Sequence, residues 1–441
     1  RMTDASQNGA HHRGSLLTVD ARTRKRNAAE ARFRYYGMAA ILTGVAFLVV
    51  LAVSIVRSGL PAFTTMAVEV EFTLTAEQYA DAEGQLFKTR AYEGYFNAAF
   101  EQQLQDRNVQ AGFDPEAVNR IIGNTGATLR SFFLENEDLL GQPVTFNLPT
   151  SSRIDGYFKG RLLRENVTDS RFLEVSDLDL ADELAEAGII QSKFNWTFIT
   201  GKDSGVDNPG GAGIGASVIG SFFMMLVVLF LSLPIGVAAS IYLEEFAPKN
   251  RITDLIEVNI SNLAAVPSIV FGILGLAVFI QFAHLPQSAP LVGGLVLTLM
   301  TLPTIIISTR ASLKSVPPSI RDAALGVGAS KMQAVFHHVL PLAMPGILTG
   351  TIIGLAQALG ETAPLLLIGM VGFVAREYPD GLISGFMDPN SAMPAQIYTW
   401  AARSDGAFYE KAWGGIIILL VFLLAMNIIA ILLRRRFERR W

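Results

Sequence analysis

The chain has 441 residues, of which 51% are hydrophobic and 17% are charged, and its formal net charge is −4. A soluble domain averages about 25% charged residues, and here the apolar excess is gathered in long uncharged runs. This pattern favours a membrane protein and argues against disorder, a disulfide scaffold or a simple nucleic-acid binder. Because the chain has no cysteine, it has no disulfide, no thiolate zinc site and no cysteine nucleophile.

Six apolar runs are long enough to cross a bilayer, which takes about 20 residues of helix. They cover Gly37–Val56, Ile214–Leu243, Leu263–Ile280, Pro290–Thr309, Ile347–Val371 and Gly415–Leu433. The first run follows a basic stretch and is not followed by a small-residue cleavage site, so we expect an uncleaved anchor. The predicted fold class is an all-α polytopic membrane protein with six transmembrane helices.

Arginine and lysine at the ends of the runs predict the orientation, because basic residues favour the cytoplasmic side. The N-terminal segment is basic, and so is the C-terminal tail with Arg434, Arg439 and Arg440. An even number of spans places both termini in the cytoplasm. The short loop at residues 282–287 carries no lysine or arginine and falls outside.

The segment between the first two spans is then extracytoplasmic. It contains an alternating run, Ala67–Leu74, and helix-like stretches at Asp114–Ile122 and Asp177–Ala187. It is large enough for a small α/β or α+β domain. The predicted organisation is a basic cytoplasmic segment (1–36), an anchor helix (37–56), an extracytoplasmic domain with its linker (57–212) and a five-span domain (213–441).

The loop between spans four and five, residues 316–341, has the pattern of a short helix followed by a second one. Ser319 is a candidate N-cap, and Asp322 favours the first turn. Gly326 and Gly328 are expected to end the short helix. Its small residues suit either docking into a groove of another protein or a plain amphipathic helix at the membrane surface.

This loop resembles the EAA loop of the ABC importer permeases, in which Glu-Ala-Ala precedes a glycine and a later Leu-Pro. The matching residues are Asp322, Ala323, Ala324, Gly328, Leu340 and Pro341, and Asp322 stands in place of the usual glutamate. In that family the loop fits a cleft of the ATP-hydrolysing subunit. The resemblance therefore implies a partner ATPase, contacted by these residues and Ser319.

The sequence contains no G-x4-G-K-[ST] phosphate-binding loop. We therefore expect no ATPase site in this chain, and ATP and Mg²⁺ would be bound by the partner. The adjacent His337 and His338 are interpreted as surface or docking residues and not as metal ligands.

Span five combines a glycine stripe with an acidic residue. Gly346, Gly350 and Gly354 follow one another at intervals of four, which lets a neighbouring helix approach closely. A carboxylate near mid-membrane costs roughly 2.5–3.5 kcal/mol on insertion scales, so Glu361 needs a partner or a polar path. Pro364 is expected to kink the helix just after it. Glu361 is therefore either a residue of a translocation path or a structural group that pairs a base such as Arg310 or caps a broken helix.

The run Gln357–Leu366 (QALGETAPLL) is similar to a signature of the PstA-type phosphate importer permeases, as are three further stretches of the five-span half. These are Leu243-Glu-Glu-Phe-Ala, Val266-Pro-Ser-Ile-Val-Phe-Gly272 and Leu302-Pro-Thr-Ile-Ile-Ile-Ser-Thr-Arg310. The resemblance implies the type I ABC importer permease fold and a bacterial inner membrane location. It also implies a second permease subunit (PstC-like), an ATPase dimer (PstB-like) and a periplasmic phosphate-binding protein (PstS-like).

The same resemblance suggests a translocation path that includes Arg310, Gln357, Glu361 and Thr362. Many relatives have an arginine where this chain has Gln357. An arginine binds an oxyanion with two parallel hydrogen bonds, whereas glutamine offers only neutral donors. The positive charge for phosphate would then come from Arg310 or from the paired permease subunit.

Two other functions stay open on the sequence. The chain would also suit a permease for another oxyanion, such as phosphonate, sulfate or molybdate. A membrane sensor or scaffold is a third hypothesis, although such a protein seldom needs five closely spaced spans with an intramembrane carboxylate. A membrane-embedded enzyme fits least, since paired carboxylates, H-E-x-x-H and a nucleophile elbow are absent from the sequence.

Overall fold

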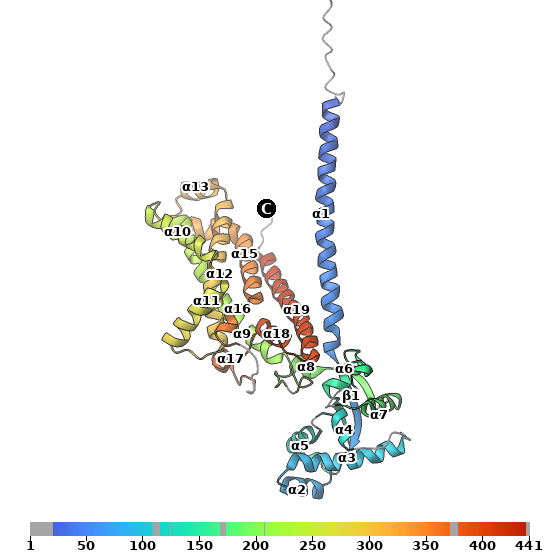
Figure 1. The fold of residues 1–441 in the computed structure, drawn as a ribbon. Helices are drawn as coiled ribbons and strands as arrows, with labels where there is room; N and C mark the ends of the chain where they lie inside the picture. Colours follow the sequence, from blue (N-terminus) through green and yellow to red (C-terminus); the bar gives the residue numbers. More distant parts are fainter. Residues whose placement is uncertain are drawn as a thin grey trace, which may run out of the picture. The chain divides into compact units, whose positions relative to one another are not determined.

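The computed structural model describes residues 21–107, 109, 115–123, 125–167, 173–206, 208–370 and 378–437. The chain forms two compact units, with their boundary between Ile55 and Val56. Most of helix α1 (Ala21–Gly59) belongs to the first unit and is described by itself (Figure 1). Its apolar side chains are exposed, as in Phe47 at 72%, which suits a helix surrounded by lipid.

Arg439 and Arg440 of the basic tail, and the end of the expected fifth span at Val371, lie outside the described residues.

The segment after α1, called here the inserted domain (residues 60–200), is an α+β structure. Its three-stranded antiparallel sheet has the order β2-β1-β3, with β1 at Thr64–Phe72, β2 at Val144–Pro149 and β3 at Ile190–Phe194. Val68 of β1 pairs with Leu148 on one side and with Ile190 on the other. The α-helices are α2 (Ala76–Gly84), α3 (Lys88–Asp106), α4 (Pro115–Ile121), α5 (Thr125–Glu135), α6 (Ser152–Phe158), α7 (Val175–Glu186) and α8 (Trp196–Thr200). Short 3-10 turns are η1 (Leu60–Phe63), η2 (Glu137–Leu139) and η3 (Arg164–Asn166).

The alternation of β1 explains the core of the inserted domain. Val68, Val70 and Phe72 are buried, while the residues between them face away. Phe72 packs against Phe96 of α3 and Phe133 of α5, with ring centroids 6.0 and 6.2 Å apart. These aromatic contacts join the sheet to the helices that cover it.

An ion-pair group ties α2, α3 and α5 together at the edge of this core. Glu83 accepts hydrogen bonds from Arg130 at 2.7 Å and from Lys88 at 2.8 Å. Both bonds favour the ionised carboxylate, so the hydrogen bonds from Arg130 and then Lys88 lower the pKa of Glu83 to about 2. The contribution of this group to stability is therefore present above the ordinary carboxyl pKa and lost as the pH falls toward 2.

The remainder of the chain is helical. Its α-helices are α9 (Gly215–Ile241), α10 (Arg251–Ala264), α11 (Ser268–Gly275), α12 (Pro290–Ser315), α13 (Pro318–Gly326), α14 (Lys331–Ala334), α15 (Leu340–Gly360), α16 (Ala363–Leu367), α17 (Leu382–Met387), α18 (Met393–Ala401) and α19 (Gly406–Phe437). Three π-helical segments continue α9, α11 and α14: η4 (Tyr242–Phe246), η5 (Leu276–Phe282) and η6 (Val335–Val339). Among the described residues, five helices are long and apolar enough to cross a membrane, or six if one bent pair counts as a span. The expected polytopic helical architecture is thus confirmed.

That bent pair corrects the third expected span. Leu263–Ile280 does not form one straight helix, because α10 ends at Ala264 and α11 starts at Ser268 after a bend of 99°. Pro267 stands at the N-cap of α11, where its missing N–H and fixed φ end one helix and begin the next. Pro234 and Pro303 behave differently, since α9 and α12 continue through them.

Helix α12 is the centre of the packing, because it contacts both α9 and α15. A Cβ atom on Gly350 of α15 would lie 2.1 Å from Ser308 Oγ and 2.4 Å from Ser308 Cβ. On Gly346 it would lie 2.4 Å from Ser312 Oγ, and on Gly354 3.4 Å from Ile305 Cγ1. The glycines of α15 therefore face α12, and the two helices run antiparallel.

These distances predict a graded response to alanine. Gly350→Ala should lower the free energy of unfolding by about 1–3 kcal/mol, the usual cost of overpacking. Gly354→Ala should be neutral or slightly stabilising, because its Cβ meets Ile305 at an ordinary contact distance and alanine favours a helix. Thermal unfolding of the purified protein in detergent measures both. Ser308→Gly should restore the stability of Gly350→Ala, and a failure to do so would contradict the proposed clash.

Candidate functional site

The 316–341 segment folds as two short helices before α15. Helix α13 begins at Pro318 with Pro317 at its N-cap, so Ser319 lies inside the first turn and the expectation that it caps the helix is wrong. The two prolines set the start of the helix two residues earlier, because proline is well suited to the first helical position. Gly326 is the last residue of α13, and Gly328 has a φ of +90°, which glycine adopts without strain.

The second helix of the segment begins with a capping box. Ser330 accepts a hydrogen bond from the Gln333 N–H, and the Gln333 side chain accepts one from the Ser330 N–H. From there α14, η6 and α15 follow without a break, so Leu340 and Pro341 form the first turn of α15. The segment is thereby joined end to end with a membrane helix.

One face of the segment is left exposed. Ala324 is buried, whereas Ser319, Asp322 and Ala323 are exposed, as are His337 and His338. Large apolar side chains are exposed on the same segment, namely Leu325 at 47%, Val327 at 87% and Met332 at 57%. An apolar patch edged by polar groups is typical of a surface that contacts another protein.

The opposite side of α13 is fixed to α9 by an ion pair. Arg321 Nη2 lies 2.7 Å from Glu245 Oε1, and the same guanidinium donates hydrogen bonds to the carbonyls of Val316 and Leu313. The Glu245 side chain is 7% exposed. Separating Arg321 from Glu245 would leave a nearly buried charge without a partner, which is costly. Arg321 therefore holds α13 firmly against η4 and α12.

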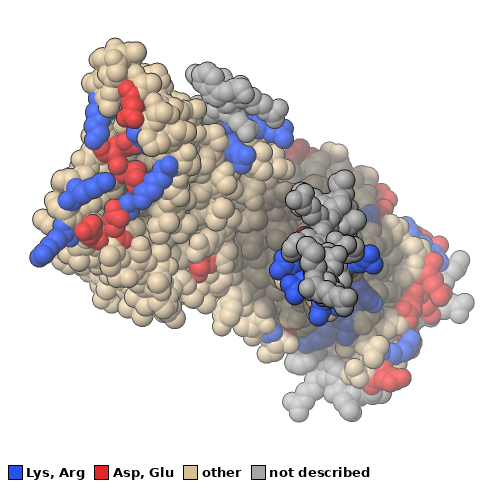
Figure 2. Space-filling model, turned by 90° about the horizontal axis from the view of Figure 1, so that it is seen from above, with Lys and Arg blue, Asp and Glu red and all other residues tan. Residues whose placement is uncertain are grey.

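A second ion-pair group lies beside the first. Arg310 Nη2 of α12 is 2.6 Å from Glu257 Oε1 of α10, and Arg310 Nε is 3.4 Å from Glu244 Oε2 of η4. Lys314 approaches Glu244 at 3.6 Å but is 59% exposed. In the view from above, blue and red side chains alternate over one region of the surface that carries these elements (Figure 2). Both signs are thus neutralised within the chain.

Arg310 and Glu361 are not neighbours. Arg310 follows Ser308 and precedes Ser312, the residues that face Gly350 and Gly346 near the start of α15. Glu361 is about 13 residues further along α15, which at 1.5 Å per residue is roughly 20 Å. The interpretation of Glu361 as the structural partner of Arg310 is therefore wrong.

Glu361 occupies a break between two helices. Helix α15 ends at Gly360, Glu361 is extended with a φ of −75° and a ψ of 133°, and Thr362 is the N-cap of α16. The helix was expected to kink just after Glu361, and the structure has a complete break there, with Pro364 in the first turn of α16. Glu361 and Thr362 are half-buried, Gln357 is exposed, and no ion pair to Glu361 is found within the described residues. Glu361 and Thr362 thus both lie at the break between α15 and α16, whereas Arg310 is distant from it.

An apolar cavity of about 400 Å³ lies between α9, α15 and α19. Its polar side chains are Thr351 and Asn427, and none of the four proposed path residues is among the described residues that line it. Such a lining offers few groups that replace the hydration of an anion. This cavity is therefore unsuited to hold an oxyanion.

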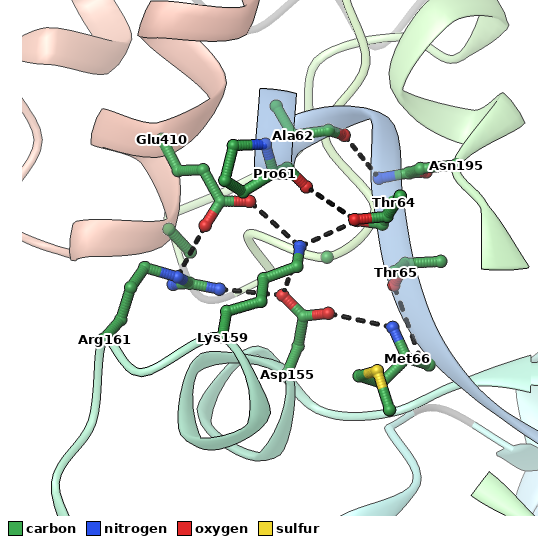
Figure 3. Close-up of polar contacts among 12 residues, drawn as sticks. Pro61, Ala62, Thr64, Thr65, Met66, Asp155, Lys159, Arg161, Asn195 and Glu410 are labelled. Atoms are coloured by element: carbon green, nitrogen blue, oxygen red, sulfur yellow. Dashed lines mark hydrogen bonds and ion pairs between the residues drawn. The ribbon is translucent and has the colours of Figure 1, made fainter. Parts of the chain in front are cut away.

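A cluster of charges joins the inserted domain to the first turn of α19 (Figure 3). Lys159 Nζ lies 2.9 Å from Glu410 Oε1 and 2.8 Å from Asp155 Oδ2, and it donates a hydrogen bond to the Thr64 carbonyl. Arg161 Nε is 2.6 Å from Glu410 Oε2. The cluster therefore links β1, α6 and α19 through the nearly buried Glu410 carboxylate.

The linker after the inserted domain is fixed to the same helices. Lys411 is buried and donates hydrogen bonds to the carbonyls of Gly210 and Ala212. Asp203 accepts hydrogen bonds from Trp400 Nε1 and Arg403 Nη2, both at 2.8 Å. The linker is rich in glycine, but these hydrogen bonds fix it to α18, to Arg403 and to α19.

The acidic partners Glu257 and Glu410 were not predicted from the sequence, and Glu244 and Glu245 were recognised only as part of a family signature. A signal was available for Glu410 and Lys411, since two charged residues directly before an apolar run need partners at the membrane edge. The identity of those partners depends on residues about 250 positions away in the chain, as with Lys159.

Comparisons with known proteins agree with this architecture. Residues 232–441 match the family described as binding-protein-dependent transport system inner membrane component. Residues 20–167 match a domain of unknown function, DUF3333. This match covers α1 and the inserted domain as far as Val167, and it carries no activity.

The relatives are permeases. The phosphate transport system permease protein PstA of Mycobacterium leprae is 30% identical over 230 residues, which are 52% of this chain and 72% of the relative. The probable ABC transporter permease protein YqgI of Bacillus subtilis is 29% identical over 247 residues, 54% of this chain and 83% of the relative. Among solved structures, the inward-facing MetNI methionine ABC transporter covers 52% of this chain and 95% of its own chain at 14% identity, with a TM-score of 0.39.

The first of these relatives reaches the identity and coverage that relate two chains as members of one family. The chain therefore belongs to the binding-protein-dependent transport system inner membrane components, as an ABC transporter permease of the PstA type with an additional N-terminal domain.

Proposed function

We propose that this chain is a membrane-spanning permease subunit of an ATP-driven importer of inorganic phosphate. The observation that supports transport is the 316–341 segment, which exposes one face while Arg321 fixes the other to the membrane helices. Phosphate is supported by the names of the relatives, which are about 30% identical over half of the chain, and by the run Gln357–Leu366.

In the proposed mechanism the exposed face of α13, with Ser319, Asp322 and Ala323, contacts a separate ATPase. Ala324, Gly328, Leu340 and Pro341 shape the segment behind that face. When the ATPase closes, α13 moves, and the Arg321–Glu245 pair transmits the movement to α9. Arg310 extends the connection to α10 and α12 through Glu257 and Glu244.

The proposed partners are a PstC-like second permease subunit, a PstB-like ATPase dimer and a PstS-like phosphate-binding protein. ATP and Mg²⁺ would be bound by the ATPase. The proposed location is the bacterial inner membrane, with both termini in the cytoplasm and the inserted domain outside. This orientation places the 316–341 segment on the same side as ATP.

The proposed path passes Gln357, Glu361 and Thr362 at the break of α15. Arg310 is engaged with two carboxylates, so it does not supply the positive charge that phosphate requires. We assign that charge to the paired permease subunit. The neutral Gln357, where many relatives have arginine, is the observation that favours an alternative, namely import of another oxyanion such as sulfate, phosphonate or molybdate.

Uptake of radiolabelled phosphate tests the function directly. Cells that lack this chain should take up little phosphate at micromolar concentration, and restoring the chain should restore uptake that excess unlabelled sulfate does not reduce. Asp322→Lys should abolish the restored uptake, because it places a cation on the face proposed to contact the ATPase. Competition by sulfate would favour the alternative oxyanion, and unchanged uptake with the protein correctly inserted would contradict import.

A second prediction concerns transmission from α13. Glu245→Gln should lower the phosphate transported per ATP hydrolysed by roughly tenfold or more in the reconstituted complex, because it leaves Arg321 without its counter-charge. Lys314→Gln is the matched control and should have little effect, because an exposed ion pair contributes about 0–1 kcal/mol. Equal coupling in the two variants would show that Arg321 transmits nothing.

A third prediction concerns the break in α15. Glu361→Gln should reduce phosphate uptake without reducing membrane insertion, since it removes the carboxylate proposed to border the path. Thr351→Val is the control on the same helix and should retain most uptake, because Thr351 lines the apolar cavity and not the proposed path. The comparison uses uptake normalised to the amount of inserted protein. Full uptake with Glu361→Gln would exclude a role for the carboxylate.

A further inference from the structure

Two exposed aromatic rings form a corner at the base of the inserted domain. Phe194 ends β3 and is 49% exposed, and Trp196 begins α8 and is 66% exposed. Their ring centroids are 4.9 Å apart at an angle of 67°. Exposure of two large apolar rings to water is unfavourable in free energy, so we expect this pair to be covered by lipid or by another molecule.

The corner is held at the start of a membrane helix. Asn195 caps α8 by accepting a hydrogen bond from the Phe198 N–H at 3.0 Å. The Ile214 N–H donates to the Phe198 carbonyl at 2.8 Å, and the Gly215 N–H to the Gly201 carbonyl at 2.9 Å. Helix α8 therefore abuts the first residue of α9, which is one of the candidate spans.

A second aromatic pair lies at the same end of the bundle. Tyr409 and Trp413, in the first two turns of α19, have ring centroids 6.0 Å apart, and Tyr409 is 52% exposed. A Cβ on Gly415 would lie 3.1 Å from Ile214 Cδ1, so the start of α9 lies beside the third turn of α19. One aromatic pair thus precedes the start of α9, and the other precedes the point on α19 that α9 contacts.

Beyond Trp413, the exposed face of α19 becomes aliphatic. Leu420, Leu424 and Ile428 follow at intervals that keep them on one face, and they are 48%, 58% and 48% exposed. Aromatic rings followed by aliphatic side chains match the order in which a helix passes from the headgroup layer into hydrocarbon. Tryptophan and tyrosine concentrate in that layer because one end of each ring is apolar and the other is polar.

We propose that Phe194 and Trp196 insert into the headgroup layer of the bilayer and hold the base of the inserted domain on the lipid. The occupant is lipid and not a soluble partner, because α8, which begins with Trp196, is hydrogen-bonded to the start of the candidate span α9. The Glu410 cluster and this corner then attach the domain in two chemically different ways, one to α19 and the other to the membrane. The proposal does not depend on which oxyanion is transported.

Tryptophan fluorescence tests the insertion in the full chain. The protein is reconstituted in phosphatidylcholine vesicles whose acyl chains carry bromine close to the headgroup, a quencher that acts only at short range. Trp196→Phe should lose a large share of the bromine-quenched intensity relative to the unchanged protein. Trp400→Phe is the matched control and should leave that component intact, because Trp400 is fully buried and bonded to Asp203.

Quenching from the water phase gives the opposing outcome. If Trp196→Phe leaves the bromine-quenched component unchanged, Trp196 is not in the lipid and the proposal fails. If, in addition, iodide in the water quenches the unchanged protein more strongly than Trp196→Phe, the corner faces water and is open to a soluble partner. The conservative replacement keeps an aromatic ring at position 196, so a loss of folding is not expected to obscure the result.

Discussion

The position of the 316–341 segment depends on the ion pair between Arg321 and Glu245. A charge that is nearly buried requires a partner, and each partner here lies on a different element. Glu245 and its neighbour Glu244 point to two arginines, one on α13 and one on α12, and the second arginine also binds Glu257 of α10. A displacement of α13 therefore affects η4 directly, because Glu245 would lose its counter-charge unless η4 followed, and Glu244 connects η4 to Arg310 of α12.

The sequence pattern predicts the structure correctly where neighbouring residues alone determine it. The alternating run near Ala67 is a strand, and the glycine stripe of α15 faces a neighbouring helix, because period and side-chain size determine both. The start of α13 lies two residues before the predicted one, because Pro318 occupies the first helical position and Pro317 takes the N-cap expected at Ser319. The third span was predicted as one continuous helix, because an average of hydropathy over many residues does not detect the bend at Pro267.

The partners of the charged residues were beyond the reach of sequence reasoning. Arg310 pairs with residues 53 and 66 positions away, and a sequence contains no measure of such distances. The surroundings of Glu361 were likewise not predictable from the sequence. Its setting between α15 and α16 follows from an interruption of the helix at Gly360, and irregular backbone at membrane depth is tolerated where protein or a polar path surrounds it.

The Glu410 cluster bears on how such a permease can gain or lose a domain. Glu410 belongs to the helical half of the chain, yet the cations that neutralise it, Lys159 and Arg161, belong to the inserted domain. A deletion of that domain alone would strand a carboxylate that is 8% exposed. We therefore expect that an exchange of this domain between permeases requires a change at residue 410 as well, although about 250 residues separate Lys159 and Glu410 in the chain.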